Sequence, residues 1–140
     1  MGHRQTHSNT TGHDLSRRIT RRLDGEQLVR LADSLPRNDR ELIEAYYGEG
    51  LTYRDLGRRH RTDARRLQRR IQRISMRMSA PEYRFAVLHH QQLPRRLKRT
   101  ADLLFIQGQS LRHTARVTGQ SLHRVRCDRA TLQTLARISA

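Results

Sequence analysis

The sequence predicts an all-α fold made of two tandem four-helix modules, each of which contains a helix-turn-helix. Three observations predict it: apolar residues recur at helical spacing, proline and glycine punctuate the apolar runs, and the second half of the chain repeats the first. We expect a disordered basic arm over residues 1–22, a first module over residues 23–79 and a second module over residues 80–140.

The composition favours a polyanion as the partner. The 140 residues carry a formal net charge of +16, and only Lys98 among the 29 basic side chains is lysine. A field of this sign attracts nucleic acid first and an anionic membrane surface second. Arginine binds phosphate and guanine with two parallel hydrogen bonds, which favours double-stranded DNA, although codon usage in a GC-rich genome would produce the same bias.

The chemistry of an enzyme is not indicated. The 13 acidic residues show no paired spacing for acid/base or two-metal work, and there is no nucleophile motif and no glycine loop for phosphate. We therefore expect no catalytic residue, no cofactor and no metal, and we interpret His3, His7 and His13 as part of an arm that lies along DNA.

Cysteine usage and hydropathy indicate the compartment. Cys127 is the single cysteine, so no intrachain disulfide can form, and no apolar run is long enough for a membrane span or a secretory signal. We expect a cytoplasmic, nucleoid-associated protein of bacterial or phage origin.

Local signals place the first helices. Asp24 and Gln27 resemble a capping box, and the helix that they begin should end near Ser34. Pro36 should begin the next helix, where proline is tolerated, and Gly50 should close it together with Gly48. The expected inward residues of these two helices are Leu28, Leu31, Leu35, Leu42, Ile43, Tyr46 and Tyr47.

A short helix, a turn and a longer helix follow between Leu51 and Met78. Thr52 should cap the short helix, Gly57 should let the second helix cross close by, and Asp63 (or Thr62) should cap the longer helix. The longer helix has one apolar stripe: Ala64, Leu67, Ile71, Ile74 and Met78. The opposite side carries Arg65, Arg69, Gln72 and Arg73.

The second half repeats these signals. Pro81 should break the long helix, and a further helix should run from Glu82 to Gln91, with His89 and His90 interacting with its C-terminal end. The two halves match when the residue numbers of the first are shifted by one constant amount, which we call the repeat offset. With this shift Leu35-Pro36-Arg37 falls on Leu93-Pro94-Arg95 without gaps. The repeat offset also pairs Tyr47 with Phe105, Gly50 with Gly108, Thr52 with Ser110, Gly57 with Ala115, Arg66 with Arg124 and Leu67 with Val125.

Both repeats are similar to region four of bacterial sigma factors. The first, LPRNDRELIEAYYGEGLTYRDLGRRHRTDARRLQRRI, matches it through Leu35-Pro36 and Gly50-Leu51-Thr52-Tyr53. The second, LPRRLKRTADLLFIQGQSLRHTARVTGQSLHRVR, matches it through Leu93-Pro94, Gly108, Ser110-Leu111, Ala115, Gly119 and Ser121-Leu122. The resemblance covers residues 35–75 and 93–133, and LuxR-type output domains share the shape.

The resemblance implies a domain that reads a promoter element and contacts RNA polymerase. The sequence departs from the family pattern at Arg61, where the turn glycine is usual, at Gly57, where alanine is usual, and at Arg129, on the apolar stripe of the second recognition helix. No segment resembles the sigma region that melts promoters, so we expect a stand-alone regulator or a phage-type transcription factor.

A docked recognition helix defines the expected contacts. Side chains expected at base edges are Arg65, Arg66, Gln68 and Arg69 in the first module and His123, Arg124 and Arg126 in the second, with Cys127 beside them. Side chains expected at phosphates are Arg54, Arg58, Arg59, Arg73, Arg112 and Arg116. Arg77 should lie where the helix leaves the groove and add only charge, and Asp128 should make the second reading face less basic.

Two other functions use the same features. A DNA-binding subunit of a recombinase or transposase system would need a similar basic helix, and an RNA-binding antitermination factor would need a similar charge. An arginine-rich helix can also be a solvated face of an unrelated bundle. A sequence-specific DNA-binding transcription regulator remains the favoured interpretation.

Overall fold

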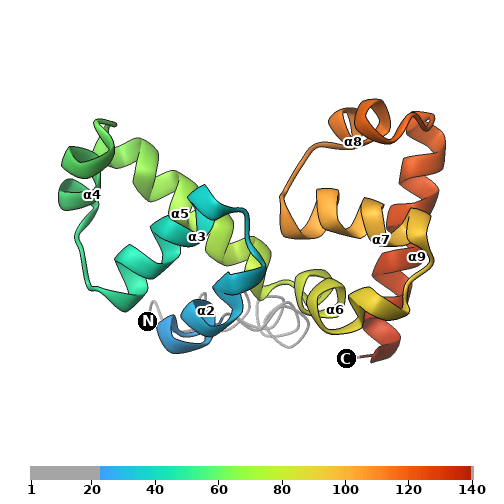
Figure 1. The fold of residues 1–140 in the computed structure, drawn as a ribbon, viewed down its shortest axis with the longest axis horizontal. Helices are drawn as coiled ribbons and strands as arrows, with labels where there is room; N and C mark the ends of the chain where they lie inside the picture. Colours follow the sequence, from blue (N-terminus) through green and yellow to red (C-terminus); the bar gives the residue numbers. More distant parts are fainter. Residues whose placement is uncertain (1–22, 140) are drawn as a thin grey trace, which may run out of the picture.

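The computed structural model describes residues 23–139, which form eight α-helices and no strand. The first half, residues 23–79, contains α2 (Gly25–Leu31), α3 (Arg37–Ile43), α4 (Tyr53–His60) and α5 (Ala64–Ser79). The second half, residues 80–139, contains α6 (Pro81–His89), α7 (Arg95–Ala101), α8 (Leu111–Thr118) and α9 (Leu122–Ser139). The all-α prediction is confirmed for this part of the chain, and the predicted basic arm lies outside the described residues (Figure 1).

The helix starts follow from the capping residues that the sequence indicated. The Asp24 carboxylate accepts a hydrogen bond from the Gln27 amide at 2.9 Å, and the Gln27 side chain accepts one from the Asp24 amide at 3.0 Å. Thr52 and Asp55 form the same reciprocal pair at α4, at 3.1 and 3.2 Å. Asp63 caps α5 through the Arg65 amide at 2.9 Å. The predicted caps at Asp24, Thr52 and Asp63 are therefore confirmed.

Two helices end in wider or tighter turns that the sequence did not signal. A 3-10 turn, Ala32–Ser34, follows α2, and a π-helical turn, Glu44–Gly48, follows α3. In the π-helical turn the Glu49 amide donates to the Glu44 carbonyl at 2.9 Å, and the Leu51 amide donates to the Ala45 carbonyl at 3.1 Å. These bonds satisfy the Glu44 and Ala45 carbonyls of the π-helical turn before the chain turns at Gly50, which has a φ of +74°.

The same succession of elements recurs in the second half at the repeat offset. The second 3-10 turn, His90–Gln92, and the second π-helical turn, Asp102–Ile106, both begin at residues that this offset pairs with the starts of their counterparts. The first residues of α7, α8 and α9 are paired in the same way with those of α3, α4 and α5. The two hydrogen bonds at the end of the π-helical turn also recur, with the Gln107 amide donating to the Asp102 carbonyl at 2.9 Å and the Gln109 amide donating to the Leu103 carbonyl at 2.8 Å.

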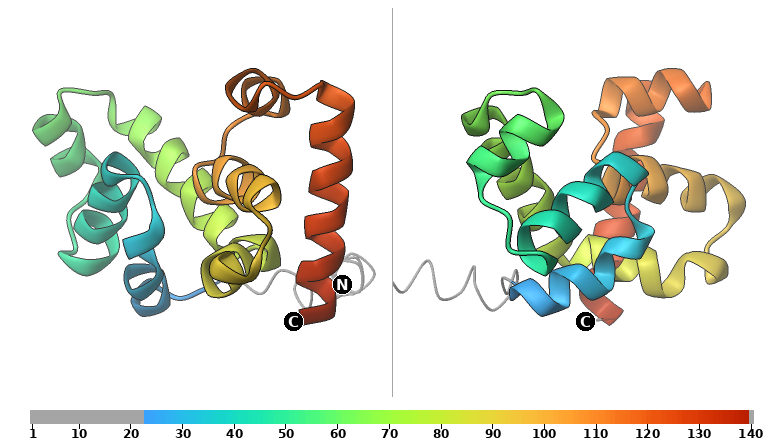
Figure 2. Two further views of the ribbon diagram at one scale, coloured as in Figure 1. Left: turned by 45° about the vertical axis from the view of Figure 1, so that its right-hand side comes forward. Right: turned by 60° about the vertical axis from the view of Figure 1, so that its left-hand side comes forward.

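A single continuous core joins the two halves. The predicted stripe of α5 is buried at Leu67, Ile71, Ile74 and Met78, and the core continues into the second half through Phe85, Ala86, Ala101, Ile106, Leu132 and Ala136. Pro81 is the first residue of α6, so α5 ends at Ser79 as predicted, and α6 packs between the end of α5 and α9 (Figures 1 and 2).

Tyr83 ties α6 to the first half. Its side chain is fully buried, and its hydroxyl donates to the Leu31 carbonyl at 2.8 Å. Leu31 is the last residue of α2, where helical carbonyls have no partner within the helix. Burial raises the pKa of the Tyr83 phenol above its ordinary value of 10.0, because the charged form would be poorly solvated there.

Two expectations for charged side chains are wrong. Arg77 is only 21% exposed and donates to the Asp39 carboxylate at 3.1 Å, so it is part of the helix packing rather than a free charge at the end of a groove. Asp128 is 3% exposed and accepts a hydrogen bond from Arg96 at 3.3 Å, so it does not lie on the outer face of α9. The Arg77 error arises because helical phase does not show which flank of a helix a neighbouring helix covers, whereas Asp128 lies three residues after the buried Val125 and four before the buried Leu132, so its phase already indicated the inner side.

The two histidines near the end of α6 have side-chain partners of their own. His89 Nδ1 lies 3.1 Å from the Gln92 amide oxygen, and His90 Nε2 lies 2.9 Å from the Asp102 carboxylate. The His90–Asp102 pair connects the 3-10 turn of the second half to its π-helical turn, and it is half-buried. Within residues 23–139 no helix combines the length and hydropathy that crossing a lipid bilayer requires.

Candidate nucleic-acid interface

The turn between α4 and α5 is tight because of Gly57 and Arg61. A Cβ atom at Gly57 would lie 2.8 Å from the Thr62 carbonyl oxygen and 3.5 Å from the Ala64 Cα, so only glycine permits this close approach. Arg61 takes the left-handed conformation, with a φ of 52°, where the chain leaves α4. The α4–α5 pair is therefore held at close quarters, as the sequence predicted for Gly57.

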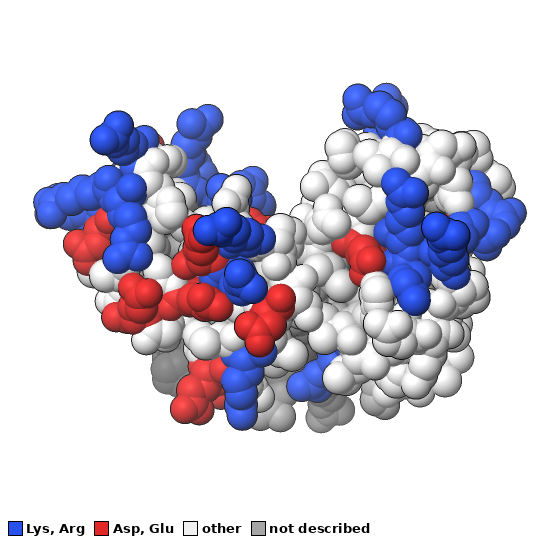
Figure 3. All heavy atoms as spheres, viewed as in Figure 1, with Lys and Arg blue, Asp and Glu red and all other residues white. Residues whose placement is uncertain are grey.

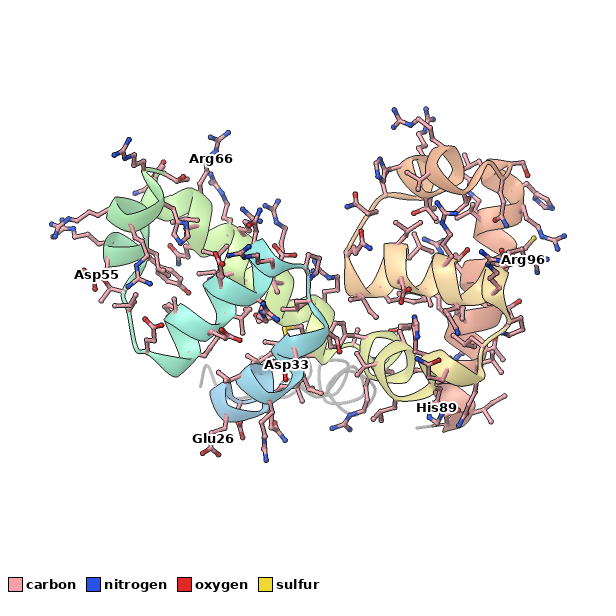
Figure 4. The ribbon with its side chains drawn as sticks, in the orientation of Figure 1. Glu26, Asp33, Asp55, Arg66, His89 and Arg96 are labelled. Carbon is pink, nitrogen blue, oxygen red and sulfur yellow. The ribbon has the colours of Figure 1, made fainter. Side chains whose placement is uncertain are left out.

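The outer face of α5 presents the side chains that the sequence assigned to base edges. Arg65, Arg66 and Arg69 are exposed on the first turns of the helix, whereas Gln68 is half-buried on one flank. Arg73 is exposed one turn further on. Within α5 there are six arginines and no acidic residue, so the positive charge of this helix is uncompensated from within. Figure 4 shows Arg66 at the upper end of α5.

The short helix α4 adds a second row of cations. Arg54, Arg58 and Arg59 are exposed, and Arg59 lies 3.6 Å from the Glu49 carboxylate. Asp55 lies between them, and its hydrogen bonds from Thr52 hold the pKa of the carboxyl below its ordinary value of 3.8, with Arg58 and Arg54 lowering it further. Asp55 is thus held at the helix cap, and Arg59 has the Glu49 carboxylate as its acidic neighbour.

A cationic cleft lies between α3 and α5. Its volume is about 440 Å³, and it is lined by Asn38, Glu41, Leu42, His60, Thr62, Arg66, Leu67, Arg70 and Arg73. Arg70 donates to Asp39 at 3.0 Å on one side of it, which fixes that guanidinium. Such a cleft, with several cations and few acids, can accept a phosphate group more readily than an apolar ligand. His60, Thr62 and Asn38 were not among the predicted contacts.

The second half has the same layout with different side chains. His123, Arg124 and Arg126 are exposed on the first turns of α9, and Cys127 is exposed beside them, 3.6 Å from His123 Nε2. Arg124 lies 3.9 Å from the buried Asp128 carboxylate, so part of its charge is directed inward. Arg112 and Arg116 are exposed on α8. Gly119, with a φ of +71°, occupies the position that Arg61 occupies in the first half.

The charges of the two halves are distributed differently. Residues 23–79 contain 13 basic and nine acidic side chains, and residues 80–140 contain 11 basic and three acidic ones. Figure 3 shows the basic side chains of the first half along its upper edge and its acidic side chains lower down. In the second half α7 is itself basic, through Arg95, Arg96, Lys98 and Arg99, which periodicity did not single out. The net charge of each residue range could have revealed it.

The sequence-predicted contacts fall into two groups on one side of the molecule. The α4–α5 group contains Arg54, Arg58, Arg59, Arg65, Arg66, Gln68, Arg69 and Arg73, and the α8–α9 group contains Arg112, Arg116, His123, Arg124 and Arg126. In Figure 1, α4, α8 and the first turns of α5 and α9 lie toward the upper edge, and Figure 3 shows a notch between the two halves at that edge. Among residues 23–139 no three His, Cys, Asp or Glu side chains are grouped so as to hold a metal ion.

Comparisons with known proteins add no family to this description. No protein-family model, no curated protein and no solved structure matches the chain. The functional argument therefore depends on the residues and their arrangement.

Proposed function

We propose that the protein is a sequence-specific double-stranded DNA-binding transcription regulator, built from two helix-turn-helix modules. The observation that carries the proposal is the outer face of α5, where exposed arginines follow a tight, capped turn and no acidic side chain shares the helix. Such a helix matches the width of the major groove, and arginine can bind guanine through two hydrogen bonds.

In this proposal α5 and α9 are the recognition helices. Arg65, Arg66, Gln68 and Arg69 contact base edges from α5, and His123, Arg124 and Arg126 contact them from α9. The side chains of α4 and α8, together with Arg73, contact phosphates and set the register. The resemblance to sigma region four adds RNA polymerase as a protein partner, and the acidic lower face of the first half, which does not face DNA, is the surface open to it.

The experiment is selection of bound sequences from random duplex DNA, followed by titration of the enriched duplex and a scrambled one over a range of salt. Six to ten phosphate contacts give a slope of log K against log salt of about −5 to −9. Enrichment of one sequence with a steep slope on both duplexes supports the proposal. No enrichment with a steep slope would point to non-specific binding, and equal affinity for single-stranded RNA would favour an antitermination factor.

A further inference from the structure

The cationic cleft between α3 and α5 has more positive charge than its own acids neutralise. Arg66, Arg70 and Arg73 recur at helical spacing on the flank of α5 that lines this cleft. Asp39 accepts hydrogen bonds from Arg70 and from Arg77, so one carboxylate serves two arginines. Among residues 23–139 no carboxylate forms an ion pair with Arg66 or Arg73. Two of the three arginines in the lining therefore lack a counter-charge from this part of the chain.

The rest of the lining adds neutral hydrogen-bond donors to these cations. Asn38 of α3 and His60 at the end of α4 are exposed and line the same cleft. Glu41, the acid of this lining, accepts a hydrogen bond from Arg37 Nε at 3.2 Å. Phosphate oxygens accept hydrogen bonds from guanidinium, amide and imidazole N–H groups, and the charge-assisted bonds among these are the strongest. This donor set therefore suits a phosphate group better than an uncharged ligand.

The counterpart of this cleft in the second half already contains an anionic group. The repeat offset pairs Arg70 with Asp128, so a carboxylate stands on α9 where α5 has a guanidinium. Asp128 is 3% exposed and accepts from Arg96 at 3.3 Å, and Arg124, the counterpart of Arg66, lies 3.9 Å from it. Figure 4 shows Arg96 against α9. The cations of the second half thus surround a carboxylate of the chain itself, whereas Arg66 and Arg73 in the first half have none.

The size of the cationic cleft limits what its ligand can be. Its volume of about 440 Å³ falls within the range of small-molecule pockets and is larger than a single phosphate ion requires. Leu42 and Leu67, which are both buried, form the apolar part of its lining. A ligand with two linked phosphate groups, or with a phosphate joined to an apolar part, therefore fills the cleft better than an isolated phosphate ion does.

We infer that the cationic cleft binds the phosphate groups of a small phosphorylated molecule, and that this ligand competes with DNA for Arg66 and Arg73. Binding of the ligand goes beyond the proposed function, whereas the competition rests on it, because these two arginines are also expected at the duplex. A ligand that engages both guanidinium groups removes one base contact and one phosphate contact. It also adds negative charge where the backbone of DNA approaches, so it inhibits DNA binding.

Titration calorimetry of the full chain with inorganic pyrophosphate tests the site without DNA. The unaltered protein should bind one pyrophosphate at fixed ionic strength. Arg66→Met should weaken this binding at least about tenfold, because it removes a charge-assisted hydrogen bond. Arg61→Met is the matched control: Arg61 is exposed between two residues of the lining but does not line the cleft. It should change the affinity less than about twofold.

A neutral substitution separates the site from the general charge of the protein. Asn38→Ala leaves the net charge unchanged and should weaken pyrophosphate binding about two- to tenfold, because it removes one neutral donor. If Arg66→Met and Arg61→Met lose affinity equally and Asn38→Ala loses none, pyrophosphate binds only through overall charge and the site is overturned. Circular dichroism verifies that each variant is folded.

Asp128→Asn tests the comparison between the two clefts. It removes the internal carboxylate with almost no change in side-chain size and leaves Arg96 and Arg124 without it. A second pyrophosphate should then bind, and the further change Arg124→Met should abolish that second site. A folded Asp128→Asn variant that gains no pyrophosphate would show that the two clefts are not equivalent. The titrations of the first-half variants do not depend on this variant.

The competition is measured on the duplex enriched by selection. Saturating pyrophosphate should weaken binding of the unaltered chain about tenfold and that of Arg66→Met less than about twofold, relative to sodium chloride at the same ionic strength. If pyrophosphate does not bind, but Arg66→Met and Asn38→Ala weaken binding to selected and scrambled duplexes alike, the cleft holds a phosphate of the DNA backbone and the small ligand is wrong. If pyrophosphate binds through Arg66 but selection enriches no sequence, the site stands and the proposed function fails.

Discussion

The two halves have the same order of helices and turns, but the acidic and basic side chains that pair between their helices stand on opposite members of each pair. In the first half the acid is on α3 and the base on α5, where Asp39 accepts hydrogen bonds from Arg70 and Arg77. In the second half the base is on α7 and the acid on α9, where Asp128 accepts from Arg96. The repeat offset pairs Asp128 with Arg70, so an acid stands in α9 where α5 has a base.

This exchange changes the long helices in opposite ways. Helix α5 keeps six arginines and no acid, because its counter-charge comes from α3. Helix α9 has four arginines and one buried acid, because α7 supplies the cations. The comparison indicates that the two halves pair the charges of their helices in opposite senses, and that only the long helix of the first half has no acidic residue of its own.

The largest expected effect comes from removing the cation of the second pair. Arg96→Met leaves the Asp128 carboxylate buried, with only Arg124 at 3.9 Å, and should lower the free energy of unfolding by about 2–3 kcal/mol. The double variant Arg96→Met/Asp128→Met should recover most of that loss, because no charge is then left buried. Urea unfolding of both variants measures it, and similar losses in the single and the double variant would contradict the pairing.

A second difference between the halves, Arg69 on α5 against Cys127 on α9, predicts different effects on DNA. Arg69→Ala should cost about 1–3 kcal/mol on the selected duplex and relax the preference at one base pair. Cys127→Arg, at the counterpart position, should tighten binding, because it restores the cation that α9 lacks. Titrations against the selected and scrambled duplexes measure both effects. Equal losses on both duplexes for Arg69→Ala would mean that α5 does not read bases.

The helix boundaries were predictable from the sequence because caps and prolines act locally. Asp24, Thr52 and Asp63 each bond to an amide two or three residues away, so short-range patterns suffice to find them. The charge pairs were not predictable, since Arg77 and Asp39 are 38 residues apart and Arg96 and Asp128 are 32 apart. Which flank of α5 is covered depends on how the helices cross, which the periodicity of one helix does not show, whereas in α9 Asp128 falls within the apolar period and only its partner Arg96 was hidden from the sequence.

The turns before α5 and α9 offer a smaller test of the comparison. Arg61 and Gly119 are counterparts, both with positive φ, and a residue with a Cβ atom is strained there by about 1–2 kcal/mol. Arg61→Gly should therefore raise the free energy of unfolding by about 1 kcal/mol, whereas Gly119→Ala should lower it by a similar amount. Thermal unfolding measures the two changes. If both variants shift stability in the same direction, the two turns are not equivalent.

The smallest expected effect concerns the helices that begin each half. The repeat offset pairs Tyr83 of α6 with Gly25 of α2, so only the second of these helices carries a buried phenol. Tyr83→Phe leaves the Leu31 carbonyl without this donor and should lower the free energy of unfolding by about 1 kcal/mol at neutral pH.

Because burial raises the pKa of Tyr83 above 10.0, the contribution of its phenol to stability is fully present below about pH 10 and is lost as the pH rises further. The unaltered protein should therefore lose stability more steeply above pH 10 than Tyr83→Phe does, with Tyr47→Phe as the control for removing a hydroxyl. Unfolding in urea between pH 8 and pH 11 measures the slopes, and parallel slopes for Tyr83→Phe and the unaltered chain would show that the phenol is not linked to folding.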